Sequence, residues 1–171
     1  MQRRSFSDVP CSIARSLDVF GDWWNPLIVR ECLYGVRKFD ELQSWLGIGR
    51  NILARRLETL VGAGVLEKRA YESRPPRFEY HLTEKGYDAA KLLVAMMAFG
   101  ETWAFEPKAE PIHVFSRKTG RRVRPAVVDA ETGKPLQPED LFAGPGPGFP
   151  PARAFRQRRF VEYYERKSAC S

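Results

Sequence analysis

The stretch Arg50–Gly86 decides the fold, and it reads RNILARRLETLVGAGVLEKRAYESRPPRFEYHLTEKG. Apolar residues three and four positions apart predict an amphipathic helix over residues 51–63 that ends in a pair of glycines. Two further runs, at 65–70 and 78–82, are typical of strands. The loop 71–77 between them holds two prolines, and we expect it to be too long for a tight hairpin. The apolar positions of the predicted helix are Leu53, Leu57, Leu60 and Val61.

Helices are predicted on both sides of this stretch. Residues 12–20, 23–33 and 39–46 precede it, have apolar residues at helical spacing and are separated by glycines. Asp22 is placed to cap the second of these helices, and Pro26 falls in its first turn, where proline is tolerated. After the stretch, a long helix is expected from Thr83 to Phe105. The pattern predicts an α+β fold in which a helix-turn-helix is followed by a hairpin.

Basic residues concentrate in the same stretch. Between Gly49 and Arg77 there are seven basic and three acidic residues, a local balance of 7 − 3 = +4 out of +7 for the chain. A basic face that neutralises DNA phosphates releases counterions, so it binds DNA in a salt-dependent way. Asn51 and Arg55 lie on the outward side near the start of the predicted helix, where base edges come within reach. The predicted DNA-contact residues are Arg50, Asn51, Arg55, Arg56, Arg74 and Arg77.

The composition of the 171 residues narrows the class of protein. Charged residues make up 29% and apolar residues 43%, which is ordinary for a soluble globular protein. The sequence has no apolar run of about 18 residues and no apolar stretch after its first arginines, so we expect a cytoplasmic protein that does not enter a membrane. It has no nucleophile-elbow, phosphate-loop or zinc-protease motif, which argues against an enzyme. We expect no cofactor.

Several short motifs occur in the order found in a known family. The chain resembles HxlR-type winged-helix regulators, bacterial relatives of the MarR type, over roughly residues 8–105. The resemblance implies a winged helix-turn-helix domain over residues 8–106 whose long C-terminal helix mediates dimerisation. The motifs that carry it are Cys11-Ser12-Ile13, Gly21-Asp22-Trp23-Trp24, Leu27-Ile28, Arg37-Lys38-Phe39-Asp40-Glu41-Leu42, Leu53-Ala54-Arg55-Arg56-Leu57, Gly64-Val65-Leu66, Arg74-Pro75-Pro76-Arg77 and Glu79-Tyr80-His81-Leu82-Thr83-Glu84-Lys85-Gly86.

The resemblance also implies how such a protein works. A homodimer would bind a palindromic double-stranded DNA operator and act as a repressor or an activator, and we expect a repressor. Its reading helix would enter the major groove, and its basic wing would contact the backbone or the minor groove. A dimer is expected on physical grounds too, because a two-fold operator requires two reading helices. The candidate dimer-interface residues are Met96, Met97, Phe99 and Trp103, with packing inside one subunit as the open alternative.

The three cysteines are too few and too scattered for a disulfide framework or a metal cluster. Cys11 precedes a helix, and the helix N-terminus with Arg15 one turn on would favour a thiolate. Some regulators of the resembled type sense oxidants or electrophiles through a cysteine at this position, so Cys11 is a candidate redox sensor. The alternative is a small buried hydrophobe, which is the role we expect for Cys32. Whether the inducer is an oxidant or a small molecule stays open.

Beyond Pro107 a T-G-basic-x-aliphatic-x-P pattern occurs twice, at 119–125 and 132–138. We predict a small β-rich module over residues 107–143, built from two glycine-turn knuckles. It resembles a zinc ribbon in outline, but Thr119, Asp129 and Thr132 stand where cysteines would be expected. Zinc needs about four Cys or His ligands, so we predict no bound metal. A Pro/Gly linker at 144–151 and a basic helix or tail at 152–171 complete the predicted organisation.

The predicted function is therefore sequence-specific DNA binding by a transcriptional regulator. The alternative is a protein-interaction or architectural DNA-binding module that uses the winged helix as a scaffold. Sequence-dependent binding with a steep salt dependence would separate the two.

Overall fold

The computed structural model describes residues 5–106, 108–141, 143 and 147–148. Contacts divide the chain into two compact units, Ser16–Pro125 and the remaining residues. The basic tail at 152–171, and the linker apart from residues 147–148, lie outside the described residues. The domain boundaries given above stay a prediction.

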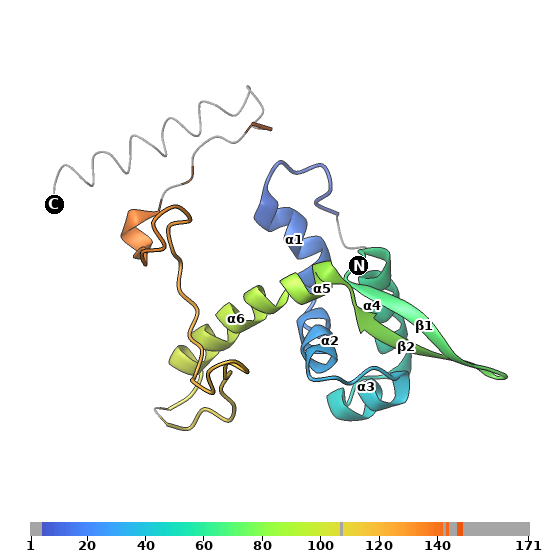
Figure 1. The fold of residues 1–171 in the computed structure, drawn as a ribbon. Helices are drawn as coiled ribbons and strands as arrows, with labels where there is room; N and C mark the ends of the chain where they lie inside the picture. The colour runs from blue at the N-terminus through green and yellow to red at the C-terminus, as the bar shows by residue number, and fades with distance from the viewer. Residues whose placement is uncertain (1–4, 107, 142, 144–146, 149–171) are drawn as a thin grey trace. The chain divides into compact units, whose positions relative to one another are not determined.

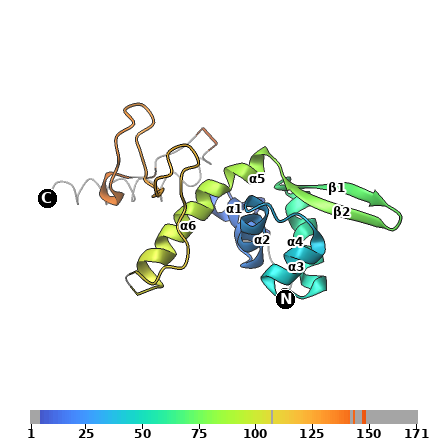
Figure 2. The ribbon, with the colours of Figure 1, turned by 60° about the horizontal axis from the view of Figure 1, so that its bottom comes forward.

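The larger unit contains a helix-turn-helix followed by a β-hairpin, as Figures 1 and 2 show. This order confirms the predicted α+β winged-helix fold. The strands β1 and β2 pair antiparallel and form a two-stranded sheet. The elements up to the hairpin are α1 (Ser12–Phe20), α2 (Trp24–Leu33), α3 (Phe39–Leu46), α4 (Arg50–Gly62), β1 (Leu66–Ser73) and β2 (Pro76–Leu82).

The core forms where α2, α3 and α4 meet the base of the hairpin. Leu53, Leu57 and Leu60 of α4 are fully or almost fully buried, so the predicted apolar stripe is confirmed. Val61 packs against this core from its edge. Burying side chains on one face of α4 leaves its opposite face to solvent, as the helical repeat requires.

Two sequence features fix the start and end of the supporting helices. The Asp22 carboxylate accepts a hydrogen bond of 3.1 Å from the Trp24 N–H, and Pro26 lies in the first turn of α2, as expected. Gly47 follows α3 with a φ of 61°, a left-handed conformation that glycine adopts without steric cost. The chain can therefore turn sharply from α3 into α4.

The hairpin is longer and tighter than predicted. The strands extend to Ser73 and Pro76, which pair directly, so only Arg74 and Pro75 form the turn. The prediction of a long loop was wrong because it ended each strand where apolar alternation stops. A two-stranded ribbon with both faces in solvent can continue through polar residues. A register shift between Ala70 and Glu72 accommodates the extra residue. Figure 2 shows the ribbon extending beyond the helices.

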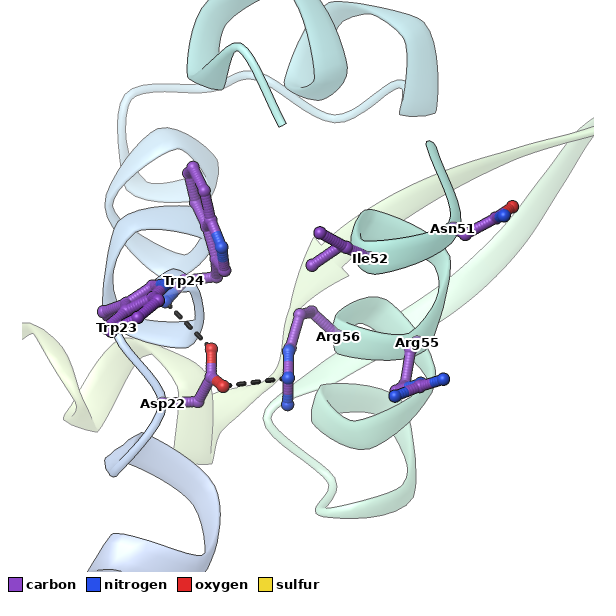
Figure 3. Close-up of a pocket in the computed structure, with 7 residues that line it drawn as sticks. All are labelled: Asp22, Trp23, Trp24, Asn51, Ile52, Arg55 and Arg56. Atoms are coloured by element: carbon purple, nitrogen blue, oxygen red, sulfur yellow. Dashed lines mark hydrogen bonds and ion pairs between the residues drawn. The ribbon is translucent and has the colours of Figure 1, made fainter. Parts of the chain in front are cut away.

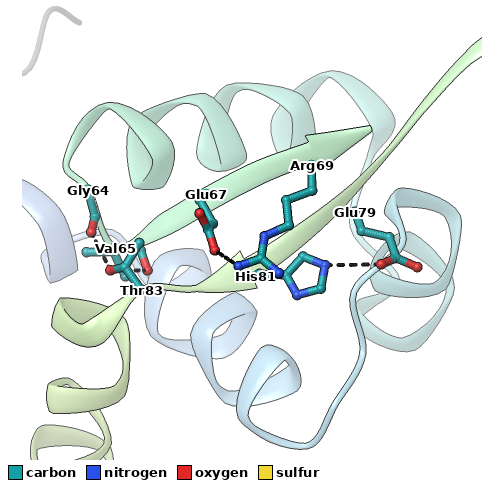
Figure 4. A network of polar contacts seen from close by, with 7 residues as sticks. All are labelled: Gly64, Val65, Glu67, Arg69, Glu79, His81 and Thr83. Atoms are coloured by element: carbon teal, nitrogen blue, oxygen red, sulfur yellow. Dashed lines mark hydrogen bonds and ion pairs between the residues drawn. The ribbon is translucent and has the colours of Figure 1, made fainter. Parts of the chain in front are cut away.

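A polar junction joins the hairpin to the following helix (Figure 4). The Thr83 hydroxyl lies 2.6 Å from the Gly64 carbonyl oxygen and accepts a hydrogen bond of 3.2 Å from the Gly86 N–H. A Cβ atom at Gly86 would lie 2.3 Å from the Val65 carbonyl oxygen. Glycine is therefore required here by close approach of two backbones, and the Thr83-Glu84-Lys85-Gly86 motif has a structural cause.

The long helix predicted after Thr83 is divided in two. Helix α5 spans Glu84–Asp88 and α6 spans Ala90–Trp103, with a turn at Ala89. The prediction of one helix was wrong at this point. Thr83 fixes the start of α5 next to the hairpin, and Ala89 and Leu93 pack into the core. The helix is interrupted at Ala89, between these two points of attachment.

Each copy of the repeated pattern forms a knuckle of the predicted kind. In the larger unit, Ser116 N–H donates to the Arg121 carbonyl oxygen and Gly120 has a φ of 66°. In the smaller unit, Asp129 N–H donates to the Lys134 carbonyl oxygen and Gly133 has a φ of 67°. Each knuckle contains one isolated β-bridge, so the extension has less regular β structure than predicted. A short 3-10 helix, η1 (Pro138–Asp140), follows the second.

The first knuckle is tied to α6 through one carboxylate. Glu101 Oε1 lies 3.0 Å from His113 Nδ1, and Glu101 Oε2 accepts a hydrogen bond of 2.7 Å from Arg122. The hydrogen bond with His113, followed by the one from Arg122, lowers the pKa of Glu101 below its ordinary value. The knuckle therefore belongs to the same compact unit as the winged helix.

Two properties of the described residues bear on partners. Over the ranges listed above, the structure contains no helix that combines the length and apolarity needed to cross a bilayer. In the same residues, no three His, Cys, Asp or Glu side chains gather where they could hold a metal ion.

Candidate nucleic-acid interface

The outward face of α4 is polar and exposed. Asn51 and Arg55 are both exposed, one turn apart, while the buried leucines lie on the opposite side. Among the described residues, none forms an ion pair or hydrogen bond with the Arg55 guanidinium. An exposed amide and an exposed guanidinium on one helix face can both form paired hydrogen bonds with base edges in a major groove.

Arg56 lies on a different side of α4. In Figure 3 its side chain points toward α2, where its Nη2 lies 2.9 Å from Asp22 Oδ2. Asn51 points away from α2 in the same view, and Arg55 lies further from α2 than Arg56 does. Arg56 is thus engaged inside the unit, although the sequence placed it with the DNA-contact residues.

Arg50 lies at the first position of α4 and faces the hairpin side. Its guanidinium is 5.0 Å from the centre of the Phe39 ring, and Nη1 is 3.9 Å from Asp40 Oδ1. Both side chains of this ion pair are largely exposed, so solvent screens it strongly. Arg50 and Arg77 line the same polar groove, about 590 Å³ in volume, between the start of α3 and the hairpin.

The wing presents exposed basic residues. Arg74 lies in the two-residue turn, and Arg77 lies on β2 with its Nε 3.3 Å from Glu72 Oε2. A hydrogen bond with Tyr71, and next the charge of Glu72, raises the pKa of Arg77, so it stays charged. A wing of this shape can place both guanidiniums against a phosphate backbone or a minor groove.

Lys38 is a further basic residue of this region and was not among the predicted DNA-contact residues. It pairs with Glu79 through an isolated β-bridge, and its Nζ lies 5.3 Å from the centre of the Tyr71 ring. It also lines the groove shared by Arg50 and Arg77. The signal was available in the Arg37-Lys38 pair before α3, but sequence spacing alone does not show that this loop pairs with β2.

His81, on strand β2 of the wing, contacts a carboxylate of the same strand. His81 Nε2 lies 3.1 Å from Glu79 Oε2 on the same strand, as Figure 4 shows. On β1, Arg69 and Glu67 form an ion pair with each other. Arg69 and Glu67 are thus paired with each other on the side of the ribbon, whereas Arg74 lies in the turn at its tip.

The two described cysteines differ in environment. Cys11 is exposed directly before α1, and the Arg15 Nε donates to the Val9 carbonyl oxygen at 3.0 Å. Cys32 is buried in α2, and burial raises the pKa of its thiol to about 12. Cys32 therefore stays protonated and behaves as a core residue, as predicted. Cys170 lies outside the described residues.

The candidate dimer-interface residues lie on α6 beyond its contact with the core. Leu93 is buried, but Met96 is 51%, Phe99 71% and Trp103 76% exposed, and Met97 is half-buried. No residue of α1 is buried either, although that helix is strongly amphipathic. Apolar side chains exposed in such a group mark an interaction surface more often than isolated ones do.

A helix-turn-helix with an exposed polar reading face and a basic hairpin defines the class of winged-helix DNA-binding proteins. A family model described as HxlR-like helix-turn-helix matches residues 19–108. The chain belongs to this family of transcriptional regulators, which are DNA-binding proteins and not enzymes.

Individual relatives agree with this assignment. The uncharacterized HTH-type transcriptional regulator Rv3095 of Mycobacterium tuberculosis is 36% identical over 138 residues, covering 81% of this chain and 87% of Rv3095. The crystal structure of PA1607, described as a candidate transcription factor, is 39% identical with a TM-score of 0.75, covering 82% of this chain and 99% of PA1607. The redox regulator HypR in its reduced form is 27% identical with a TM-score of 0.51, covering 54% of this chain and 92% of HypR.

Proposed function

We propose that the protein regulates transcription as a homodimer on a two-fold symmetric operator. Helix α4 enters the major groove, and Asn51 and Arg55 read base edges. Arg50, Arg74 and Arg77 contact the phosphate backbone or the adjacent minor groove. The observation that carries the proposal is that Asn51 and Arg55 are exposed on a helix whose opposite face is buried in the core.

The dimer in this proposal forms through α6. The core uses Leu93 and leaves the following apolar turns uncovered, with Met96, Phe99 and Trp103 exposed. Burying such side chains against a second copy would stabilise the pair by the hydrophobic effect. Two reading helices held by one dimer then match two half-sites about one helical turn apart.

Repression is the sign of regulation that we propose. A dimer bound across promoter DNA excludes polymerase without further protein contacts. A reporter gene behind the selected operator tests the sign: repression lowers reporter output when the protein is expressed, and a rise in output would show activation.

The test of DNA recognition is selection from a random-sequence duplex library. The wild-type protein should enrich a two-fold symmetric sequence, and binding to it should weaken steeply with salt because phosphate contacts release counterions. Salt-dependent binding without any enriched sequence would favour an architectural role. Absence of DNA binding would favour a scaffold for protein interactions.

We also propose Cys11 as an oxidant input. Its exposure next to the start of α1 makes the thiol accessible, and HypR, a redox regulator by name, shares the fold at 27% identity. Diamide should change the affinity of the wild-type protein for the selected duplex and leave that of Cys11→Ser unchanged. If diamide changes the DNA affinity of both proteins equally, Cys11 is not the oxidant sensor.

A further inference from the structure

A half-buried ion pair joins α4 to the start of α2 (Figure 3). Arg56 Nη2 lies 2.9 Å from Asp22 Oδ2, and the two side chains are 22% and 17% exposed. Solvent screens this pair less than the exposed pairs of the wing. Asp22 and Arg56 form a polar link between α4 and the start of α2.

The Asp22 carboxylate is held at a fixed point. Its Oδ1 accepts a hydrogen bond of 3.1 Å from the Trp24 N–H, and its backbone carbonyl oxygen accepts one of 3.1 Å from the Asn25 N–H. The buried Asn25 side chain in turn donates to the Val19 carbonyl oxygen at 2.5 Å. The end of α1, the first turn of α2 and the Asp22 carboxylate are therefore connected by consecutive hydrogen bonds.

The direction of this contact matters for base reading. Apolar packing of Leu53, Leu57 and Leu60 buries one face of α4, and the Asp22–Arg56 pair adds a charge-assisted, directional contact on another side of the helix. Successive residues of a helix point about 100° apart, so a contact that holds Arg56 toward Asp22 favours a rotation of α4 in which Arg55 points to a different side. Paired hydrogen bonds to a base tolerate errors of only about 0.5 Å or 10–20°.

We propose that the Asp22–Arg56 ion pair is a positioning contact that sets the rotation of α4 and thereby the base preference of Asn51 and Arg55. It also keeps Arg56 from binding phosphates of unrelated DNA. This inference rests on the proposed function of α4 as a reading helix.

The experiment measures the specificity ratio, which is the affinity for the duplex selected by the wild-type protein divided by the affinity for a scrambled duplex. Asp22→Asn keeps an oxygen that can accept from the Trp24 N–H but removes the charge. Arg56→Gln removes the other partner, and Arg56→Lys is the conservative variant. Asp88→Asn is the matched control, because Asp88 pairs with Lys91 at the junction of α5 and α6.

Asp22→Asn and Arg56→Gln should each lower the specificity ratio by about tenfold or more, the size of one lost base contact. The specificity ratio of the double variant should fall no further than that of either single variant, because the same contact is removed in all three proteins. Arg56→Lys should retain more of the ratio than Arg56→Gln, and Asp88→Asn should match the wild type. Asp22→Asn alone should bind the scrambled duplex more tightly, because it releases Arg56 to bind phosphates.

Three outcomes would overturn the inference: an unchanged ratio in folded Asp22→Asn, additive losses in the double variant, or weaker binding of the scrambled duplex by Asp22→Asn. If Asp22→Asn does not fold, Arg56→Gln and Arg56→Lys decide by the same ratio. A wild-type protein that enriches no sequence would instead refute the proposed function, and the inference with it. If the wild-type protein binds a specific sequence but the variants have the same specificity ratio as the wild type, the inference is refuted and the proposed function stands.

Discussion

At the scale of single residues, Arg55 and Arg77 differ in what their guanidinium groups can contact. Arg55 projects from the reading face of α4, whereas Arg77 lies on the wing beside Glu72. A side chain that reads a base contributes to discrimination, and one that holds a phosphate contributes equally on every sequence. The two arginines therefore provide a paired test of the helix and wing roles.

Arg55→Ala should cost about 1–3 kcal/mol of binding free energy on the selected duplex and relax preference at one base position. Arg77→Ala should weaken binding to all duplexes about equally and reduce the slope of log affinity against log salt by about 1. Affinity measured on matched and single-mismatch duplexes over a salt series gives both quantities. The opposite assignment of effects would show that the roles are exchanged.

Gly86→Ala should destabilise the fold. The new Cβ would lie 2.3 Å from the Val65 carbonyl oxygen, so the junction between the hairpin and α5 has to shift, at a cost of about 1–3 kcal/mol. Gly62→Ala is the control, because a Cβ there meets nothing within 4 Å. Denaturant unfolding measures both variants. Equal stability of the two would contradict the backbone contact described at Gly86.

Sequence reasoning at this scale succeeded where spacing alone determines burial. It identified the leucines of α4 and the outward Asn51 and Arg55. It included Arg56 among the DNA-contact residues, because sequence spacing does not show that Asp22 lies beside Arg56 in space. The role of Gly86 was also hidden, since it depends on a carbonyl group more than twenty residues earlier in the chain.

At the scale of elements, the tie between α6 and the first knuckle depends on the charge of Glu101. Its pKa is lowered from an ordinary value of 4.5, first by His113 and then by Arg122. A carboxylate with a lowered folded pKa contributes stability that is present above its unfolded pKa and is lost as pH falls through the folded value. The knuckle should therefore stay attached at neutral pH and loosen only below about pH 4.5.

Glu101→Gln should loosen the knuckle at neutral pH already. Amide chemical shifts of Ser116 and Val123, which form the knuckle's backbone hydrogen bonds, report its state in a pH titration. Glu106→Gln serves as a control near the end of the same helix. A knuckle whose shifts are the same in wild type and Glu101→Gln at neutral pH would contradict the role of this carboxylate.

Element boundaries were predictable where a local signal marks them. Gly47 and Asp22 fixed the helix starts and ends around them. The hairpin turn and the interruption at Ala89 were not predictable in this way, because both result from pairing and packing between segments. The repeated knuckles were visible in the sequence, since left-handed glycines at 120 and 133 belong to the repeated pattern itself.

At the scale of the whole molecule, the account requires a dimer. The native mass should be twice the chain's 19.6 kDa. Trp103→Glu should shift the protein toward the monomer, because a charge would be buried in an apolar interface. Trp45→Glu is the control, as Trp45 is 73% exposed on α3, close to the 76% of Trp103. Light scattering after gel filtration gives the masses, and a wild-type monomer would contradict the dimer.

Hydroxyl-radical footprinting on the selected duplex tests the central claim most directly. Two reading helices in one dimer should protect two half-sites related by two-fold symmetry, with centres about 10–10.5 base pairs or a multiple of that apart. Flanking protection from the wings should disappear from both sides together in Arg74→Ala/Arg77→Ala. A single protected patch, or uniform protection along the duplex, would contradict a dimeric winged-helix regulator that reads its operator through α4.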